Sequence, residues 1–548
     1  MMEIGRQSHK LGRVVAVTGG QIIVLLGDEI GGGQSAGVVQ VGHLVRIATV
    51  RSQVYGIISG LSIPMPSPGA DGPELKIAEI DLLGEVLDVA DGGDGSFRRG
   101  ISIMPSLDDL VSTADQGDTG IVYARPNQQT VCIGTVHQDQ RVKAHVGIDD
   151  LLGKHFAVVG TTGAGKSCAV TLILKRILES NPNAHILLLD PHGEYARAFG
   201  DQAEHLTAES LNLPHWLFNF EEISEVVFGA EARDLVAELQ SLRELILAAK
   251  LRFAGAGRDT SWITVDTPVP YRMGDLVQLL DDALGRLENR ADRGSYLRIK
   301  SRLAALQADR RYAFMFPANL FLVDDLAPLL GRLFRVPVDG RPLAILDLAG
   351  MPSEVLNVVV SVLSRMAFDF AFWGDQSVPL LVVCEEAHRY APKDDNAGFE
   401  PTKRALARIA KEGRKYGISL CVVSQRPSEL APSLLSQCNT VFALRMTSHK
   451  DQEIIHAAIL DASSALMAAL PSLGNAEAIA VGEGMPVPMR LRFSDLPPEE
   501  RPRSGTAPFS ARWQADGGSA SLLGHIVDCW RQQKRDGGPL ERGRQTVG

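Results

Sequence analysis

The segment that most constrains this chain is a glycine-rich octapeptide, Gly160-Thr-Thr-Gly-Ala-Gly-Lys-Ser167, which follows the apolar run His155–Val159. An apolar strand, a glycine-rich turn and then a helix from Cys168 to Glu179 is the order typical of a P-loop. The glycines let successive backbone N–H groups point inward, and the N-terminal end of the helix adds partial positive charge. The segment therefore predicts polyphosphate binding, in preference to an accidental glycine-rich turn.

Two side chains of this segment have specific expected roles. Lys166 is expected to reach the β- and γ-phosphates, and Ser167 to ligate Mg²⁺. ATP and Mg²⁺ are therefore the expected ligands. The predicted nucleotide-binding residues are Gly160, Thr161, Thr162, Gly163, Ala164, Gly165, Lys166, Ser167 and Cys168.

Length and composition place the segment in a large globular protein. A chain of 548 residues is too long for one core and predicts several domains. Apolar residues make up 45% of the chain and charged residues 22%, as in a globular protein. No run of 18 apolar residues occurs, and the first ten residues are polar. We therefore expect a cytoplasmic protein without a membrane span. The six cysteines form no C-x-x-C pair and are expected to be reduced thiols. A net charge of −10 argues against a uniformly basic surface, although a ring or channel can concentrate positive charge locally.

The residue pattern changes along the chain. Residues 11 to 145 carry short β-branched runs between turns, which predicts a small β-barrel; its expected strands are Arg13–Val17, Gln21–Leu26, Leu44–Val50, Val54–Ser59, Leu75–Leu87 and Thr130–Val136. From Leu151 apolar strands alternate with helices, which predicts a parallel α/β sheet. The expected strands of this sheet are His155–Val159, His185–Asp190, Leu343–Leu348, Leu380–Glu385, Ser419–Ser424 and Thr440–Leu444.

Helical periodicity interrupts the α/β pattern and predicts an inserted helical bundle, with helices Ser224–Phe253, Met273–Asn289 and Tyr296–Asp309. Two further strands, Ala476–Gly482 and Pro488–Phe493, precede a proline-rich segment and a basic tail from Arg531 to Gly548. The predicted domains are a barrel at 1–147, an ATPase core at 148–210 and 336–450, the insertion at 211–335, and a C-terminal region with a mobile tail at 451–548.

Two carboxylates, Glu385 and Glu386, end the apolar strand that begins at Leu380. Because the strand opens into a loop there, both can reach the γ-phosphate region. We expect Glu385 to bind Mg²⁺ through water and Glu386 to polarise the attacking water; the alternative is a strand end with solvated acids. Gln425 follows the next strand and is predicted to sense the γ-phosphate, the alternative being an ordinary strand-end amide.

Asp190 ends the second predicted strand of the sheet, in Asp190-Pro-His-Gly-Glu-Tyr195. Its carboxylate can join the outer shell of the metal, or it can accept hydrogen bonds from the backbone of the turn that follows. The sequence favours neither interpretation.

The predicted helix Thr402–Tyr416 carries a basic stripe. Four basic side chains fall within about 60° of one another at helical spacing: Arg404, Arg408, Lys411 and Lys415. The opposite face carries Leu406, Ile409 and Ala410. Such a stripe can contact a DNA backbone, or it can be a solvated face. Arg414 lies off the stripe and could reach the γ-phosphate of a neighbouring subunit as an arginine finger.

These motifs together resemble the HerA family, hexameric DNA translocases of the HerA–FtsK branch of P-loop ATPases. The resemblance spans residues 10 to 495 and rests on Leu152–Phe156, Gly160–Ser167, Asp190–Tyr195, Glu385–His388, Ala410–Gly417, Ser424–Pro427 and Val487–Arg490. It implies a RecA-like core with a helical insertion, a barrel of the rotary ATP synthase type, a C-terminal brace across subunits, and a ring that threads duplex DNA. It also implies that Arg414 is the residue acting on the neighbouring subunit. Lys154 stands at a position where relatives often carry Arg. The resemblance therefore does not decide whether Lys154 contacts the nucleotide.

The leading hypothesis is therefore an ATP-driven translocase or helicase on double-stranded DNA. It would act as a homohexamer with a nuclease or a sirtuin-like NAD-consuming effector, in DNA end processing or antiphage defence. The alternative is an ATP-gated ring scaffold that activates such a partner with little translocation. A rotary-type ATPase subunit is disfavoured, because that family places its base soon after the P-loop helix and not after a strand such as Leu380–Cys384.

Overall fold

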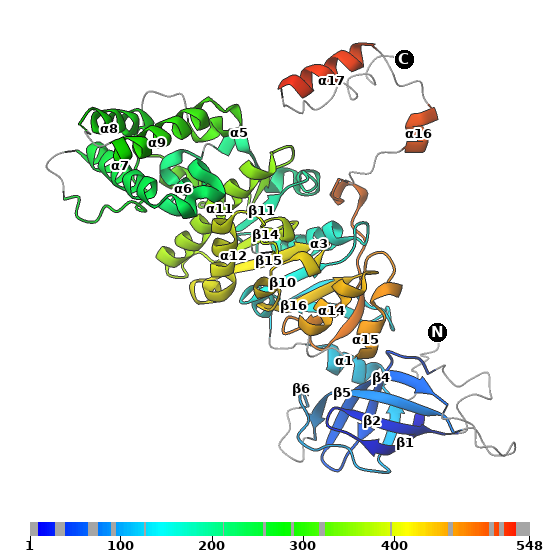
Figure 1. The fold of residues 1–548 in the computed structure, drawn as a ribbon. Coiled ribbons are helices and arrows are strands. Elements are labelled where there is room, and N and C mark those ends of the chain that lie inside the picture. Colours follow the sequence, from blue (N-terminus) through cyan, green and yellow to red (C-terminus); the bar gives the residue numbers. More distant parts are fainter. Residues whose placement is uncertain are drawn as a thin grey trace. The chain divides into compact units, whose positions relative to one another are not determined.

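The computed structural model describes residues 9–27, 39–63, 75–88, 95–124, 128–211, 213–255, 259–286, 290–316, 324–394, 397–458, 464–503, 509–514 and 520–532. Figure 1 shows the fold, coloured along the sequence. The chain divides into two compact units. Unit 1 consists of Met1–Leu187, Phe334–Pro342 and Ser364–Pro498, and unit 2 consists of Leu188–Leu333, Leu343–Leu363 and Glu499–Gly548.

A small β-barrel forms the first part of unit 1. Its strands are β1 (Lys10–Val17), β2 (Gln21–Leu26), β3 (Leu44–Ala48), β4 (Ser52–Ser62), β5 (Ile77–Leu87), β6 (Phe97–Arg99) and β7 (Leu110–Thr113). They run in the order β2-β1-β7-β3-β4-β5-β6, and a pairing of β2 with β5 closes six of them into a barrel, with β6 added beside β5. Closure leaves the six barrel strands no free edge, and the predicted barrel is confirmed.

The barrel has its own apolar core. Alternate residues along the strands point inward, as the period of a strand requires. The inward residues include Val14, Val24, Ile47, Val54 and Ile80, each at most 1% exposed.

The second part of unit 1 is a mixed sheet. Its strands run in the order β14 (Leu380–Cys384), β15 (Ile418–Ser424), β10 (His155–Val159), β16 (Cys438–Leu444), β17 (Glu477–Gly482), β18 (Met489–Phe493), β8 (Thr130–Val136) and β9 (Lys143–Gly147). The first four pair in parallel and the others pair antiparallel. The carboxyl ends of β10, β14 and β15 therefore lie at one edge, with β15 between the other two.

The hairpin of β8 and β9 corrects the predicted extent of the barrel. The sequence pattern predicts Thr130–Val136 as a barrel strand, but β8 pairs with β18, with Phe493 opposite Gly134. The assignment of this strand to the barrel is wrong, because alternating β-branched residues indicate a strand but do not indicate which sheet the strand joins. The barrel strands end at Thr113, and the boundary at residue 147 moves toward the N-terminus.

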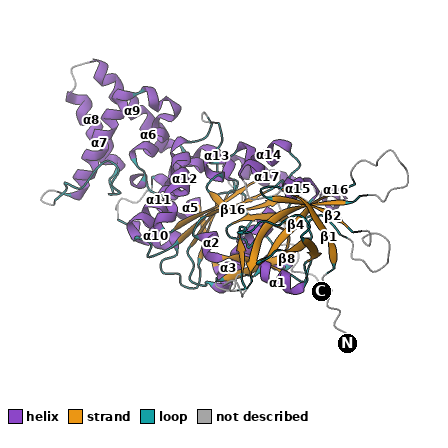
Figure 2. Ribbon diagram, turned by 90° about the horizontal axis from the view of Figure 1, so that it is seen from below, coloured by secondary structure: helices purple, strands orange, loops and turns teal. Residues whose placement is uncertain are grey.

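Unit 2 contains the inserted helices. Figure 2 shows α6 (Phe220–Phe228), α7 (Val236–Ala254), α8 (Met273–Arg286) and α9 (Arg290–Ala308) as a group of helices. The expected single helix Ser224–Phe253 is broken, because Gly229 takes a left-handed φ of 63° and a 3₁₀ turn follows it. The aliphatic part of Lys250 is buried in α7, and its ammonium donates to the carbonyls of Val265 and Thr267 at 2.5 and 2.6 Å. In the same unit β12 (Ala203–Thr207) pairs in parallel with β13 (Leu343–Asp347).

Further elements complete the described part of the chain. They are α1 (Gln116–Tyr123), α2 (Ile148–Leu152), α3 (Lys166–Ser180), β11 (Ile186–Asp190), α4 (Ala196–Phe199), α5 (Ala208–Leu211), α10 (Leu326–Phe334), α11 (Ser353–Gly374), α12 (Glu400–Glu412), α13 (Pro432–Leu435), α14 (His449–Ala458), α15 (Ser464–Ala468), α16 (Phe509–Gln514) and α17 (Ala520–Gln532). Among the described residues α11 alone is long and apolar enough to cross a membrane, and 72% of its most apolar window is buried, as in a core helix. Of the basic tail, residues 533–548 lie outside the described residues.

Candidate active site

The P-loop lies between β10 and α3. Gly163 and Gly165 have φ values of 79° and 101°, a left-handed region that costs other residues about 1–2 kcal/mol. Gly165 is the N-terminal cap residue of α3, so the loop leads directly into the positive end of a helix of 15 residues. Lys166 is 7% exposed, and its ammonium donates to the carbonyl of Thr161 at 3.3 Å.

Two neighbouring strand ends hold the P-loop backbone in place. The N–H of Gly160 donates to the carbonyl of Ser424, the last residue of β15, at 3.3 Å. The N–H and hydroxyl of Thr161 both donate to the carbonyl of Arg445, at 2.9 and 3.0 Å, after β16. The loop is thus fixed from both sides of β10, which keeps its N–H groups oriented before a ligand binds.

The predicted carboxylates lie at the carboxyl end of β14. Glu385 and Glu386 are 3% and 6% exposed, so the solvated-acid interpretation is wrong. Glu386 has φ 54° and ψ 43°, a left-handed conformation that costs a residue with a side chain on the order of 1–3 kcal/mol. Its carbonyl accepts from the N–H of Arg389 at 2.8 Å, so the turn after the strand fixes this conformation.

A chain of side-chain contacts joins the P-loop, β15 and β14. The hydroxyl of Thr162 donates to the side-chain carbonyl of Gln425. Ser424, the preceding residue, has its Oγ 3.2 Å from Nδ1 of His388. The same Nδ1 lies 3.3 Å from Oε2 of Glu386. Residues predicted separately from three motifs therefore belong to one site.

His388 was not assigned a role from the sequence, although it stands in the quoted motif Glu385–His388. Burial lowers the pKa of the His388 imidazole, against the opposing effect of Glu386, so the ring is neutral at pH 7. A neutral ring can orient the Glu386 carboxylate without forming a full ion pair with it.

His155 is a second histidine that sequence reasoning missed. Its Nδ1 accepts from the N–H of Leu420 at 3.0 Å, and its ring also hydrogen-bonds to the backbone of Ile409 and Ala410. Burial lowers its pKa, so this ring is neutral too. His155, the first residue of β10, is thus hydrogen-bonded to the backbone of both β15 and α12.

The basic helix is shorter than predicted. α12 ends at Glu412, and Gly413–Tyr416 form a 3₁₀ turn that stops at Gly417, which has a φ of 78°. Arg414 is exposed on this turn, outside the α-helix. The expected apolar face is buried through Leu406, Ile409 and Ala410.

The stripe itself is exposed, and two of its members interact within the chain. Arg404 pairs with Glu400 at 3.3 Å. Arg408 lies 4.0 Å from the ring centre of Phe368 and 3.7 Å from Asp369. Lys411 and Lys415 are also exposed. DNA contact by these four residues stays a prediction.

Asp190 lies in unit 2 and is fully buried. One carboxylate oxygen accepts from the N–H groups of His192 and Gly193 at 3.2 and 2.9 Å, and the other accepts from Tyr195 at 3.0 Å. Burial raises the pKa of Asp190 in spite of these bonds. The turn-capping interpretation is confirmed, and a role in the metal shell stays a prediction.

The residues present fit ATP and Mg²⁺. A Cβ added to Gly163 would meet nothing within 4 Å, so open space borders the loop there. The donor set of loop N–H groups, a buried lysine and a serine suits a polyphosphate and its hard cation. The described residues contain no group of three or more His, Cys, Asp and Glu side chains that could hold another metal, and all six cysteines are free. Lys154 pairs with Glu483, which occupies its ammonium.

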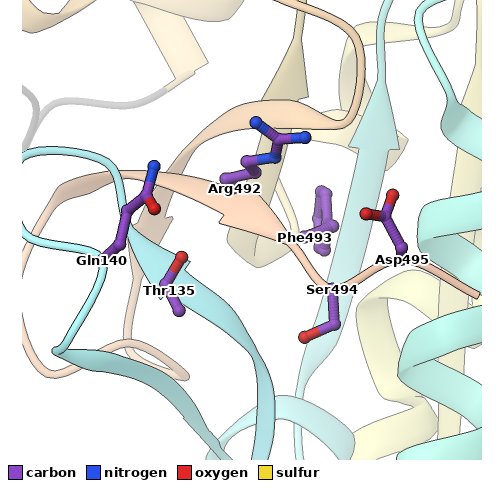
Figure 3. A pocket seen from close by; sticks show the side chains of 6 residues that line it. All are labelled: Thr135, Gln140, Arg492, Phe493, Ser494 and Asp495. Atoms are coloured by element: carbon purple, nitrogen blue, oxygen red, sulfur yellow. The ribbon is translucent and has the colours of Figure 1, made fainter.

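A shallow cavity of about 370 Å³ lies beside β8 and β18 (Figure 3). It is lined by Thr135, Gln140, Arg492, Phe493, Ser494 and Asp495. The N–H of Phe493 donates to Ala476, whose own N–H donates to Ala164 of the P-loop. No sequence motif indicates this cavity, because its residues come from strands far apart in the chain.

Several known proteins are similar to this chain. Residues 131–367 match the family described as "Helicase HerA, central domain". The DNA double-strand break repair helicase HerA of Pyrococcus furiosus is 25% identical over 539 residues, covering 90% of this chain and 89% of that protein. The HerA of Saccharolobus solfataricus is 25% identical over 407 residues, covering 71% and 74%. VirB4 of Thermoanaerobacter pseudethanolicus superposes with a TM-score of 0.49 at 17% identity, over 69% of this chain and 99% of that one.

The chain therefore carries a central domain similar to that of the HerA helicases over residues 131–367, and it is similar to HerA proteins over most of its length.

Proposed function

We propose that this protein is an ATP-driven translocase or helicase on double-stranded DNA that works as a homohexameric ring. The observation that carries the proposal is the contact chain from Thr162 through Gln425 and Ser424 to His388 and Glu386. It joins the phosphate loop, the expected sensor and the expected base across three neighbouring strands. Relatives that cover most of the chain are named as DNA double-strand break repair helicases.

Within one chain, the P-loop residues would hold the nucleotide. Its N–H groups would bind the phosphates, and Lys166 would neutralise charge on them. Ser167 and Glu385 are the residues that would hold Mg²⁺, which when bound neutralises and orients the phosphates. Glu386 would accept the proton of the attacking water, and Gln425 would report the state of the γ-phosphate to β15.

Hydrolysis would be completed by a neighbouring subunit. Arg414 is exposed on the 3₁₀ turn that follows α12. The ring of His155, the first residue of β10, hydrogen-bonds to the backbone of Ile409 and Ala410 near the end of α12. An arginine placed on an exposed turn suits insertion into the site of another copy. An arginine finger raises kcat by a factor of about 10³–10⁵. This dependence would make ATP hydrolysis a property of the ring.

The exposed lysines of α12 would contact the DNA backbone. Since the protein carries a net charge of −10, DNA binding requires a local concentration of positive charge, and the stripe supplies one. Lys411 and Lys415 are better placed for this than Arg404 and Arg408, which already interact with acidic or aromatic groups of their own chain. A nuclease or an NAD-consuming effector that docks on the ring is the remaining part of the proposal, and it rests on the family resemblance.

The test measures ATPase rate with and without linear duplex DNA at about 50 mM salt, where backbone contacts are strong. We expect duplex DNA to raise the rate severalfold, and we expect particles with the mass of six chains in the presence of an ATP analogue. Glu386→Gln gives the background rate. A rate that duplex DNA leaves unchanged would refute the DNA part of the proposal.

A double variant, Lys411→Ala with Lys415→Ala, tests the stripe. Each lost phosphate contact should reduce the slope of log affinity against log salt by about 1, so the double variant should lose about 2. Lys450→Ala, an exposed lysine on α14, is the matched control and should leave the slope unchanged. Equal slopes in all three proteins would show that the stripe is a solvated face.

A further inference from the structure

His388 lies between the expected base and the strand that carries the expected sensor. It belongs to the 3₁₀ turn Ala387–Arg389 that follows Glu386. Its single atom Nδ1 lies 3.3 Å from Oε2 of Glu386 and 3.2 Å from Oγ of Ser424. The three side chains come from the ends of two neighbouring strands, β14 and β15.

Burial makes this contact specific. The side chains of His388 and Glu386 are 10% and 7% exposed, and Ser424 is fully buried. Water competes poorly for hydrogen bonds in such a position, so the orientation of each group depends on the others. The left-handed conformation of Glu386 turns the chain so that two side chains only two residues apart meet.

The two contacts of Nδ1 differ in kind. The approach to Oε2 of Glu386 lacks the geometry of a hydrogen bond, so this contact is electrostatic. The hydrogen bond of Nδ1 is made with Oγ of Ser424 at 3.2 Å, and this oxygen also accepts from the N–H of Arg426 at 3.1 Å. Ser424 is thereby held by the backbone that immediately follows Gln425.

We propose that His388 is a positioning residue that orients the carboxylate of Glu386 and links it, through Ser424, to the strand end that carries Gln425. The inference deepens the proposed function and rests on it for the role of Glu386. A shift of β15 when Gln425 meets the γ-phosphate would move Ser424, and with it the ring that holds the base. The nucleotide state would thus be transmitted to the base through one imidazole nitrogen.

Two amide substitutions separate the ring positions. In His388→Asn the side-chain amide lies near the place of Nδ1, whereas in His388→Gln it reaches toward the place of Nε2. We expect His388→Asn to keep kcat within about threefold of the wild type. We expect His388→Gln and His388→Ala to lower kcat by roughly 10- to 100-fold, the cost of a misplaced catalytic group, with KM for ATP unchanged.

Ser424→Ala tests the link to β15. It should lower kcat in the same direction as His388→Ala, with KM for ATP near that of the wild type, and it should reduce the ratio of the rates with and without duplex DNA. All variants are measured as full-length protein, with binding of a fluorescent ATP analogue and thermal unfolding as checks of the folded site.

The inference is overturned if His388→Ala keeps wild-type kcat. It is also overturned if Asn and Gln lower kcat equally, or if nucleotide affinity falls in parallel with kcat, since either result indicates a merely structural role. If duplex DNA fails to stimulate the wild type, the proposed function fails, but the basal kcat of the His388 variants still decides the inference.

Discussion

Arg99 offers the most direct test of how the barrel is held on the ATPase sheet. It lies at the end of β6, and its guanidinium donates to three backbone carbonyls, one at the last residue of β17 and two in the turn that follows. The distances are 2.8 Å to Gly482, 2.8 Å to Met485 and 2.9 Å to Pro486. Replacing Arg99 with Ala removes all three bonds and leaves the carbonyls without this donor.

The expected cost follows from burial. The bonds to Met485 and Pro486 are partly buried, while the bond to Gly482 is exposed and contributes little. At about 1 kcal/mol net for each partly buried bond, Arg99→Ala should weaken docking of the barrel by about 2 kcal/mol. That corresponds to a rise of roughly 30-fold in the population with the barrel released, at 1.4 kcal/mol per factor of ten.

Limited proteolysis between β7 and β8, at residues 114–129, measures this population. When opening is fast relative to cleavage, the cleavage rate follows the open fraction. Arg98→Ala, on the neighbouring position of β6, is the matched control, and Arg99→Lys keeps the charge but loses the planar fork. A cleavage rate of Arg99→Ala within twofold of Arg98→Ala would refute the reasoning.

Three further predictions concern the nucleotide site and the insertion. Lys166→Ala should abolish measurable binding of a fluorescent ATP analogue, and tight binding by this variant would contradict the phosphate assignment. Arg414→Ala should keep ATP binding but lose about 10³-fold in turnover; mixing it with Lys166→Ala subunits should restore part of the rate, and normal hydrolysis by pure Arg414→Ala would place the finger elsewhere. Burial lowers the pKa of His215 from 6.5 to about 4, so the folded state binds its proton less readily than the unfolded state. The neutral His215 ring therefore contributes to the free energy of unfolding in full above pH 6.5. This contribution, about 3 kcal/mol, is lost as the pH falls to about 4. Urea unfolding across this range should show that His215→Gln flattens the slope, and an unchanged slope would contradict the burial argument.

The sequence predicted which strand ends lie side by side better than it predicted the extent of each sheet. The P-loop, Glu386 and Gln425 were found because each follows an apolar strand, and the carboxyl ends of parallel strands meet at one edge. The same reasoning could not assign Thr130–Val136 to a sheet, since the partner strand β18 lies at Met489–Phe493 and alternation carries no information about pairing.

The missed histidines show a second limit. His388 and His155 act through contacts between strands that are neighbours in space but distant in the chain. In the sequence each is a lone histidine beside an apolar run, a pattern as typical of a core residue as of a site residue. The break at Gly229 has a simpler cause: helical periodicity continues across it, and only the left-handed φ of the glycine interrupts the helix.

The hairpin of β8 and β9 also bears on how this protein is made. Its partner β18 leaves the ribosome roughly 350 residues after β8, which at about 5–20 residues per second is a delay of roughly 20 to 70 s. The barrel strands precede this hairpin and can close at once, whereas the edge of β8 that pairs with β18 waits uncovered through most of synthesis. An uncovered strand edge is a site of mispairing between chains. Nascent chains should therefore be most prone to aggregation after the barrel has folded and before residue 489 is added.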